Sequence, residues 1–163
     1  MRRRGPTDSA GFLLWQLTLR WREALDEALA PFGLTHTNYV VLASVFWLVA
    51  TSDSPNQRRI SDHCGLEQMN ISKAVRALEA DGLLARNPDR ADGRAFSLVV
   101  TARGERTFRR AVRVLDRVEA QFLASLGDRT ESFKDQLRTV LRAVGAPSTL
   151  TVAPTRSGEG KGP

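Results

Sequence analysis

Polar and basic side chains gather along a predicted helix over residues 68–81, and their chemistry suits contact with a nucleic acid. Ile71, Val75 and Leu78 recur at intervals of four and three residues, which is the spacing of a buried helical stripe. A period of 3.6 residues then places amide, hydroxyl and cationic groups on the far face or at its edges. Such groups bind base edges and phosphates, and the alternative is an ordinary solvated face. We expect DNA contacts from Asn70, Ser72, Lys73 and Arg76, and from Gln68 in the first turn.

A second basic stretch, residues 86–94, has the composition of a turn between two strands. Its asparagine, proline, aspartate and glycine residues favour a turn, and the alternation of Phe96, Leu98 and Val100 predicts the returning strand. Narrow minor grooves attract arginine through their negative potential. We therefore predict DNA contacts from the arginines of this stretch, with a surface ion pair to Asp92 as the alternative for the last of them. These arginines are Arg86, Arg90 and Arg94.

The elements that must position these side chains form a helix-turn-helix followed by a hairpin. Asn56 is suited to cap a helix that turns Ile60 and Cys64 inward, and Gly65 supplies the tight turn into residues 68–81. Two short helices and a basic hairpin predict a winged helix-turn-helix. The expected fold class is mainly α with a small β wing, an α+β arrangement.

The predicted first, fifth and sixth helices each carry an apolar stripe that a single chain has no other surface to bury. Thr35 can cap a second, nearly all-apolar helix at the centre, and Thr101 can cap the fifth. Since no other lobe is available, we predict that the outer helices meet a second copy in a homodimer. The stripes are Leu14, Leu17, Trp21, Leu25 and Ala28, then Phe108, Ala111, Leu115, Val118 and Phe122, and then Phe133, Leu137, Val140, Leu141 and Val144.

The predicted organisation has five segments. They are a flexible basic N-terminus (1–8), a dimerisation helix (9–31), a winged helix-turn-helix DNA-binding region (32–100), C-terminal dimerisation helices (101–145) and a disordered tail (146–163).

The composition excludes several classes of protein. A chain of 163 residues with 42% hydrophobic residues can bury the core of one domain, and its formal charge of +6 favours an anionic partner such as nucleic acid. The longest mainly apolar run, residues 39–50, would extend only about 18 Å as a helix, whereas a bilayer core is roughly 30 Å thick. The N-terminus lacks the apolar core of a signal peptide. We therefore predict a cytoplasmic protein with no membrane association.

Aromatic side chains suggest a site for a small aromatic effector, in a cleft between the dimer helices and the winged region. An aromatic wall with a cation suits an aromatic carboxylate, although aromatic residues at helical spacing also serve as core. The candidate ligand-binding residues are Trp15, Arg22, His36, Tyr39 and Trp47.

The single cysteine and the two histidines indicate no further chemistry. We interpret Cys64 as a small core residue, with a sensor thiol as the alternative. His36 and His63 do not have the spacing of metal ligands. No nucleophile, base and orienting group can be assembled from local motifs, and there is no phosphate-binding glycine loop. We predict no metal site, no cofactor and no enzymatic activity.

Four motifs follow one another in a recognisable order. They are Phe-Gly-Leu-Thr at 32–35, Gly-Leu at 65–66 with Ile-Ser-Lys at 71–73, Leu-Glu-Ala-Asp-Gly-Leu at 78–83, and Asp-Gly-Arg-Ala at 92–95 leading to Val-Thr-Ala-Arg-Gly at 100–104. Together, over roughly residues 12–144, they resemble the MarR family of winged-helix transcriptional regulators. The resemblance implies a homodimer that binds near-palindromic double-stranded DNA, usually represses, and is often released by a small aromatic acid or by oxidation. It also implies that residues 68–76 lie on the recognition helix, that Arg94 enters the minor groove and that Asp92 helps to position it.

The expected function is that of a dimeric, sequence-specific DNA-binding regulator, a repressor released by a small aromatic ligand. Two alternatives remain at this point. One is a dimeric winged-helix adaptor that binds proteins, and the other is a thiol-based redox regulator acting through Cys64.

Overall fold

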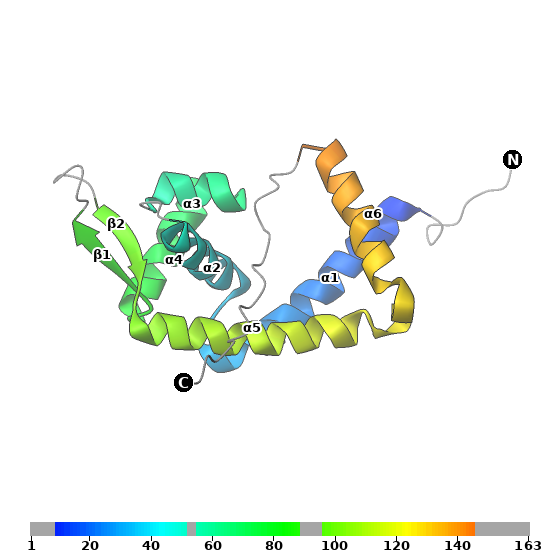
Figure 1. The fold of residues 1–163 in the computed structure, drawn as a ribbon, viewed down its shortest axis with the longest axis horizontal. Coiled ribbons are helices and arrows are strands. Elements are labelled where there is room, and N and C mark those ends of the chain that lie inside the picture. The colour runs from blue at the N-terminus through cyan, green and yellow to red at the C-terminus, as the bar shows by residue number, and fades with distance from the viewer. Residues whose placement is uncertain (1–8, 52–54, 89–95, 146–163) are drawn as a thin grey trace, which may run out of the picture.

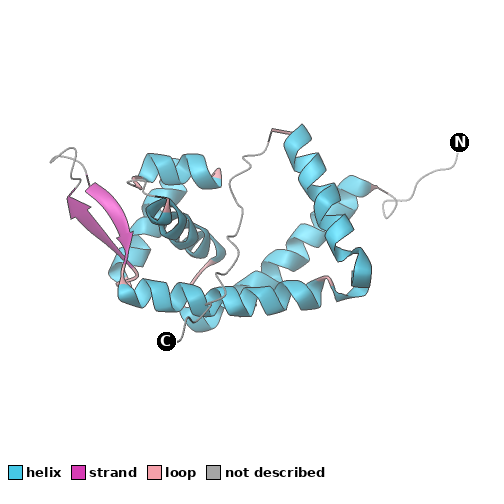
Figure 2. Ribbon diagram, viewed as in Figure 1, coloured by secondary structure: helices cyan, strands magenta, loops and turns pink. Residues whose placement is uncertain are grey.

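A computed structural model describes residues 9–51, 55–88 and 96–145, which form two connected parts (Figure 1). We call residues 25–112 the winged lobe, and residues 10–24 with 113–145 the arm. Helices dominate both parts, and the described strands form one two-stranded antiparallel sheet (Figure 2), so the predicted fold class is confirmed. The elements are α1 (Ala10–Leu29), η2 (Ala30–Phe32), α2 (His36–Ala50), α3 (Gln57–Cys64), α4 (Gln68–Ala80), β1 (Leu84–Pro88), β2 (Phe96–Val100), α5 (Ala102–Phe122), η3 (Ala124–Arg129) and α6 (Thr130–Ala143).

Helix α2 lies at the centre of the winged lobe, where α3, α4, α5 and β2 all contact it. Val41, Leu42 and Val45 are fully buried, as expected for a helix that is apolar on nearly every side. The side chain of Thr35 accepts a hydrogen bond from the backbone N–H of Asn38 at 3.1 Å, which confirms the predicted cap. No single described helix has the length and hydropathy to cross a membrane, and only α1–η2 with α2, across a 72° bend, match such a span by length and composition.

The helix-turn-helix is formed by α3 and α4, as predicted. Asn56 caps α3 by accepting a hydrogen bond from the Arg59 N–H at 2.9 Å. Gly65 ends α3 with φ +68°, a conformation that glycine adopts without strain. The Ser61 hydroxyl donates to the Leu66 carbonyl at 2.6 Å across this turn, which fixes the approach to α4.

The wing consists of β1 and β2, paired antiparallel from Leu84 opposite Val100 to the strand ends at residues 88 and 96. Leu98 is buried and anchors the returning strand, and its N–H donates to the Pro55 carbonyl at 2.8 Å. The tip of the wing, residues 89–95, lies outside the described residues.

The start of α5 is fastened to the end of α4. Thr101 caps α5 by accepting from the Gly104 N–H, while its own hydroxyl donates to the Gly82 carbonyl at 2.7 Å. Its backbone N–H donates to the Leu83 carbonyl at 3.1 Å. A Cβ atom on Gly104 would lie far inside van der Waals contact with that carbonyl oxygen. Only glycine therefore allows α5 to approach the α4–β1 connection this closely.

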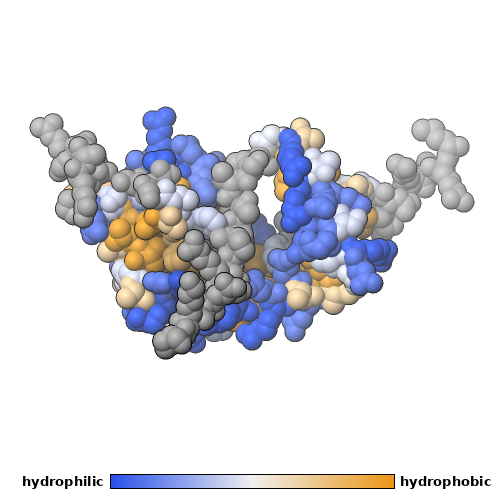
Figure 3. Space-filling model, in the orientation of Figure 1, coloured by the Kyte–Doolittle hydropathy of each residue, from blue (hydrophilic) through white to orange (hydrophobic). Residues whose placement is uncertain are grey.

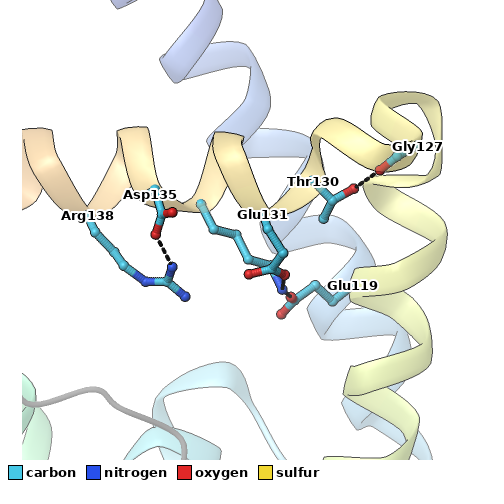
Figure 4. A network of polar contacts seen from close by, with 7 residues as sticks. Glu119, Gly127, Thr130, Glu131, Asp135 and Arg138 are labelled. Carbon is cyan, nitrogen blue, oxygen red and sulfur yellow. Dashed lines mark hydrogen bonds and ion pairs between the residues drawn. The ribbon is translucent and has the colours of Figure 1, made fainter.

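The arm continues from the point where α5 leaves the winged lobe, through η3 to α6 (Figure 1), and its α1 contacts α5. Lys134 ties α6 to α5 through an ion pair with Glu119 at 2.7 Å and also contacts Glu131 at 3.3 Å; Figure 4 shows this network. No residue of α6 is buried, although its sequence carries an apolar stripe. The exposed large apolar residues of the arm are Leu13, Leu14, Trp15, Leu17, Leu19, Val140, Leu141 and Val144.

Candidate nucleic-acid interface

The solvent face of α4 presents the residues predicted to contact DNA. Ile71, Val75 and Leu78 are fully buried, which fixes the rotation of the helix about its axis. The opposite side chains therefore point to solvent. Gln68, Asn70, Lys73 and Arg76 are exposed and Ser72 is half-buried at the edge, so one helix brings the five residues together.

The positive charge of this face is not neutralised. In the described part of the chain, neither Lys73 nor Arg76 forms an ion pair with an acid. Arg76 lies back along its own helix, where its guanidinium donates to the hydroxyl of Ser72 at 3.1 Å and to the Ser72 carbonyl at 3.3 Å. Because these bonds are exposed, exchanging them for a phosphate contact costs little.

Met69 is a residue of this face that the predicted DNA contacts did not include. Its side chain is 67% exposed, so it does not fill a gap in the core of the single chain. An exposed apolar group beside cationic ones suits the methyl group of thymine. Its exposure leaves this side chain available for contact with a base.

Arg86, predicted to contact DNA from the wing, forms an ion pair with Glu79 on α4 and remains partly exposed. Its guanidinium donates to both carboxylate oxygens of Glu79, at 2.6 and 3.1 Å, and this hydrogen bonding raises the pKa of Arg86. The pair joins β1 to the last turns of α4. Glu79 was missed because its partner lies seven positions along the chain, beyond the turn at Gly82, which no helical spacing indicates. The other predicted wing residues, Arg90, Asp92 and Arg94, lie outside the described residues.

Of the predicted effector-binding residues, those at the start of α2 lie closest to one another. The ring of Tyr39 stacks on Phe108 with centroids 5.9 Å apart, and burial, with a smaller contribution from Asp116, raises the pKa of Tyr39 to about 12. Burial lowers the pKa of His36, with Asp26 opposing and Arg22 adding to that shift. Arg22, His36 and Tyr39 therefore share one region between α1 and α2.

The two tryptophans of the predicted effector site lie elsewhere. Trp47 is eight residues beyond Tyr39 on the same helix, a rise of about 12 Å. Trp15 is exposed near the start of α1, where it contacts Phe12 with ring centroids 5.8 Å apart. A single chain therefore brings together only part of the predicted aromatic set.

Cys64 is half-buried between α2 and α3. Its thiol donates to the Ile60 carbonyl at 3.0 Å, and burial raises its pKa. A thiol that stays protonated at neutral pH is a poor nucleophile toward peroxide. This environment agrees with a packing role and gives no support to a sensor thiol. Among the described residues, no group of three or more His, Cys, Asp or Glu could hold a metal ion.

Comparison with known proteins points to one family. A model of the MarR family matches residues 32–95. The HTH-type transcriptional regulator YdcH of Bacillus subtilis, itself uncharacterised, is 31% identical over 138 residues, which are 85% of this chain and 93% of YdcH.

Two structures extend the likeness, one of the repressor CouR bound to DNA and one of CouR from Rhodococcus jostii RHA1 bound to p-coumaroyl-CoA. That complex superposes with a TM-score of 0.73 at 25% identity, covering 93% of this chain and 99% of CouR. CouR bound to a 23-mer DNA duplex gives a TM-score of 0.71 at 26% identity, covering 88% and 97%. The winged arrangement described above is thus shared with a repressor that binds DNA and an aromatic thioester.

Proposed function

The chain belongs to the MarR family of DNA-binding transcriptional regulators, and from this premise we propose that it acts as a homodimeric, sequence-specific repressor whose grip on DNA is released by a small aromatic ligand. We propose no catalytic role, because the relatives it matches are named as regulators.

The observation that carries this proposal is the solvent face of α4. Buried residues hold it in a fixed orientation, and it offers Lys73 and Arg76 without neutralising acids in the described part of the chain. Amide groups from Gln68 and Asn70 lie beside these charges. Cations for phosphates and amides for base edges are the combination that sequence-specific DNA recognition uses.

Dimerisation is supported by the apolar residues of the arm. Val140, Leu141 and Val144 are more than half exposed in one chain, and Figure 3 shows hydrophobic residues at the surface near the upper end of α6. Leu14 and Trp15 on α1 are about half exposed too, at 49% and 56%. Covering such residues is worth about 25 cal/mol per Å² of apolar surface. A second copy of the same chain supplies a matching surface by two-fold symmetry.

A dimer presents two copies of α4 to one duplex. Recognition helices about 34 Å apart enter successive major grooves on one face of DNA, and two-fold symmetry then requires a near-palindromic operator. Two copies also carry twice the formal charge of +6, which strengthens attraction to phosphates and makes the affinity fall with salt. We propose that Arg90 and Arg94 contact the DNA beside these major grooves, with Asp92 helping to position Arg94.

Release by a small aromatic ligand rests on the region around Tyr39. Phe46 and Phe108 have ring centroids 4.8 Å apart there, and His36 and Arg22 add polar groups at the edge. An aromatic surface with a nearby cation suits an aromatic acid. A ligand at this place would lie between the arm and the winged lobe, where it can change the separation of the two α4 helices. Trp15 and Trp47 would join the site only if the partner chain or a rearrangement brings them closer.

The experiment that tests the proposal compares two variants that remove the same charge. We expect Lys73→Ala to weaken operator binding by about 1 kcal/mol or more in a gel-shift titration, because it removes a phosphate or base contact. Arg129→Ala, on η3 in the arm, is the matched control and should bind as the parent does. Equal affinity for Lys73→Ala and the parent would contradict recognition through α4.

Selection of bound sites from a random DNA pool tests symmetry and specificity together. A repressor of this kind should enrich a near-palindrome with half-sites one helical turn apart. A winged-helix adaptor that binds proteins should enrich no sequence. Enrichment of a single, asymmetric half-site would contradict the dimeric mode.

A further inference from the structure

A basic hollow lies on the outer side of the first turns of α5, beside η2. It has a volume of about 340 Å³. Its arginines project from a different face of α5 from that of Phe108 and Ala111, which face the core. The hollow is therefore separate from the aromatic region around Tyr39, and none of the predicted DNA contacts lines it. The lining residues are Pro31, Phe32, Arg103, Arg106, Thr107 and Arg110.

Three arginines converge on this hollow without a neutralising acid. Arg103, Arg106 and Arg110 follow one another at intervals of three and four, so they share one helical face. In the described part of the chain, none of the three forms an ion pair. Three like charges within one small hollow repel one another, and a bound anion would relieve that repulsion.

The neighbouring arginine on the same helix shows what a neutralised site looks like. Arg109 lies 5.7 Å from the ring centre of Phe46, and it also forms an ion pair with Glu105 at 2.7 Å. Arg110 lies 5.6 Å from the ring centre of Phe32, with no such acid. Stacking on the ring therefore holds Arg110 at the hollow while its charge remains available.

We propose that this hollow binds the phosphate or diphosphate group of a small molecule. Guanidinium groups match phosphate oxygens through paired N–H donors, and several of them together favour a multiply charged anion over a carboxylate. The Thr107 hydroxyl adds a further donor. The ring of Phe32 and the side chain of Pro31 give the hollow an apolar wall, which suits an organic group attached to the phosphate.

The shape of the site favours a small molecule over the backbone of DNA. A duplex is a wide rod that contacts protruding cations, whereas these arginines line one side of a hollow whose volume is that of a small-ligand site, with Pro31 and Phe32 completing the lining. The phosphate chemistry is the same for both sources, so the experiment must separate them.

The test uses inorganic pyrophosphate as the probe and isothermal titration calorimetry of the full-length protein at low salt. We expect one saturable site per chain, with affinity reduced about tenfold or more in Arg106→Ala and further in Arg103→Ala/Arg106→Ala, since each change removes a charge-assisted contact. Arg109→Ala removes the same charge from the next face of the helix and should bind pyrophosphate as the parent does. Thermal unfolding followed by circular dichroism checks that all variants fold.

Two results would overturn the proposal. One is the absence of saturable pyrophosphate binding, or equal binding by all four proteins. The other is loss of affinity for duplex DNA in Arg103→Ala/Arg106→Ala without any pyrophosphate binding, which would assign the arginines to the DNA backbone. The titration contains no DNA, so its outcome is independent of whether Lys73 reads an operator.

Discussion

The winged lobe and the arm use apolar residues at similar helical spacing, yet only one of them buries these residues within the chain. In the lobe, Leu42, Ile71 and Leu78 are all fully buried. In the arm, α6 has no buried residue, and Leu141 is 53% exposed. The same kind of sequence pattern thus produces a complete core in one region and an open surface in the other.

This difference indicates that the lobe can fold as a single chain, whereas the arm exposes a surface suited to assembly. The lobe closes around α2, which contacts helices on several sides, so it needs no second chain for its core. In the arm, α1 packs along α5, where the rings of Trp21 and Phe122 lie 5.1 Å apart, whereas α6 is held by η3 and by the ion pair between Lys134 and Glu119. An apolar surface held in place by polar contacts at one end is what an interface between two copies requires.

Core substitution in the lobe should have the largest effect on stability. We expect Leu78→Ala to lower the free energy of unfolding by about 2–5 kcal/mol, because it leaves a cavity among fully buried neighbours. Urea denaturation at several protein concentrations measures this cost. The cost of Leu141→Ala should be smaller at low concentration and rise with concentration, since we propose that a dimer buries that side chain. If both variants lost the same unfolding free energy at every protein concentration, the proposed difference between lobe and arm would be contradicted.

Charges on the arm should separate the two copies while leaving the lobe folded. The double change Val140→Asp and Leu141→Asp places two carboxylates on the exposed apolar surface of α6. We expect the dissociation constant of the dimer to rise about tenfold or more, because the two carboxylates would lie at the centre of the interface. Sedimentation velocity measures it. Arg138→Ala, on a polar position of the same helix, is the control. A double variant that sediments as the parent does would show that α6 lies outside the interface.

A smaller effect is expected where the wing joins α4. Glu79→Gln and Arg86→Ala should each lower stability modestly, with a coupling of about 0.2–1 kcal/mol in a double-mutant cycle, because the pair is partly exposed. The same cycle measured for DNA affinity distinguishes two roles of Arg86. If Arg86 only positions the wing, its loss should add nothing once Glu79 is changed. Further loss of affinity in the double variant would show that Arg86 also contacts DNA.

The smallest effect concerns His36 at the boundary of the two regions. Its pKa is lowered in the folded chain, mainly by burial, so the unfolded chain binds a proton more readily. The stability that depends on neutral His36 is therefore present above the ordinary pKa of 6.5 and is lost as the pH falls through the folded-state value. We expect the difference in unfolding free energy between the parent and His36→Gln to change below this pKa. A constant difference in urea denaturation across that range would contradict burial of this side chain.

Local signals in the sequence predicted the helix starts well. Thr35, Asn56 and Thr101 all cap helices as expected, because capping depends on residues three positions apart. The buried stripe of α4 was predicted for the same reason, since periodicity alone fixes which face packs inward.

Contacts between elements could not be read from local patterns. The Glu79–Arg86 pair spans a turn, and helical spacing indicates no aromatic partner for the arginines of α5. Only the rotation of α5 against the core separates Arg109, which meets Glu105 and Phe46, from Arg110, which meets Phe32. The place of Trp15 also depends on tertiary geometry, which helical spacing does not encode.

The contacts of Thr101 and Gly104 with the Leu83 carbonyl fix the start of α5 to the end of α4, so we expect α5 to move as a rigid body. Its 21 residues extend about 31 Å, so a tilt of about 2° at the arm displaces the end fixed to α4 by roughly 1 Å. Because a Cβ atom on Gly104 would clash with the Leu83 carbonyl oxygen, α5 contacts the end of α4 closely here, and we expect such a displacement to reach Leu83. The single added methyl group of Gly104→Ala would push α5 away from the α4–β1 connection, so that movement of the arm would no longer reach α4.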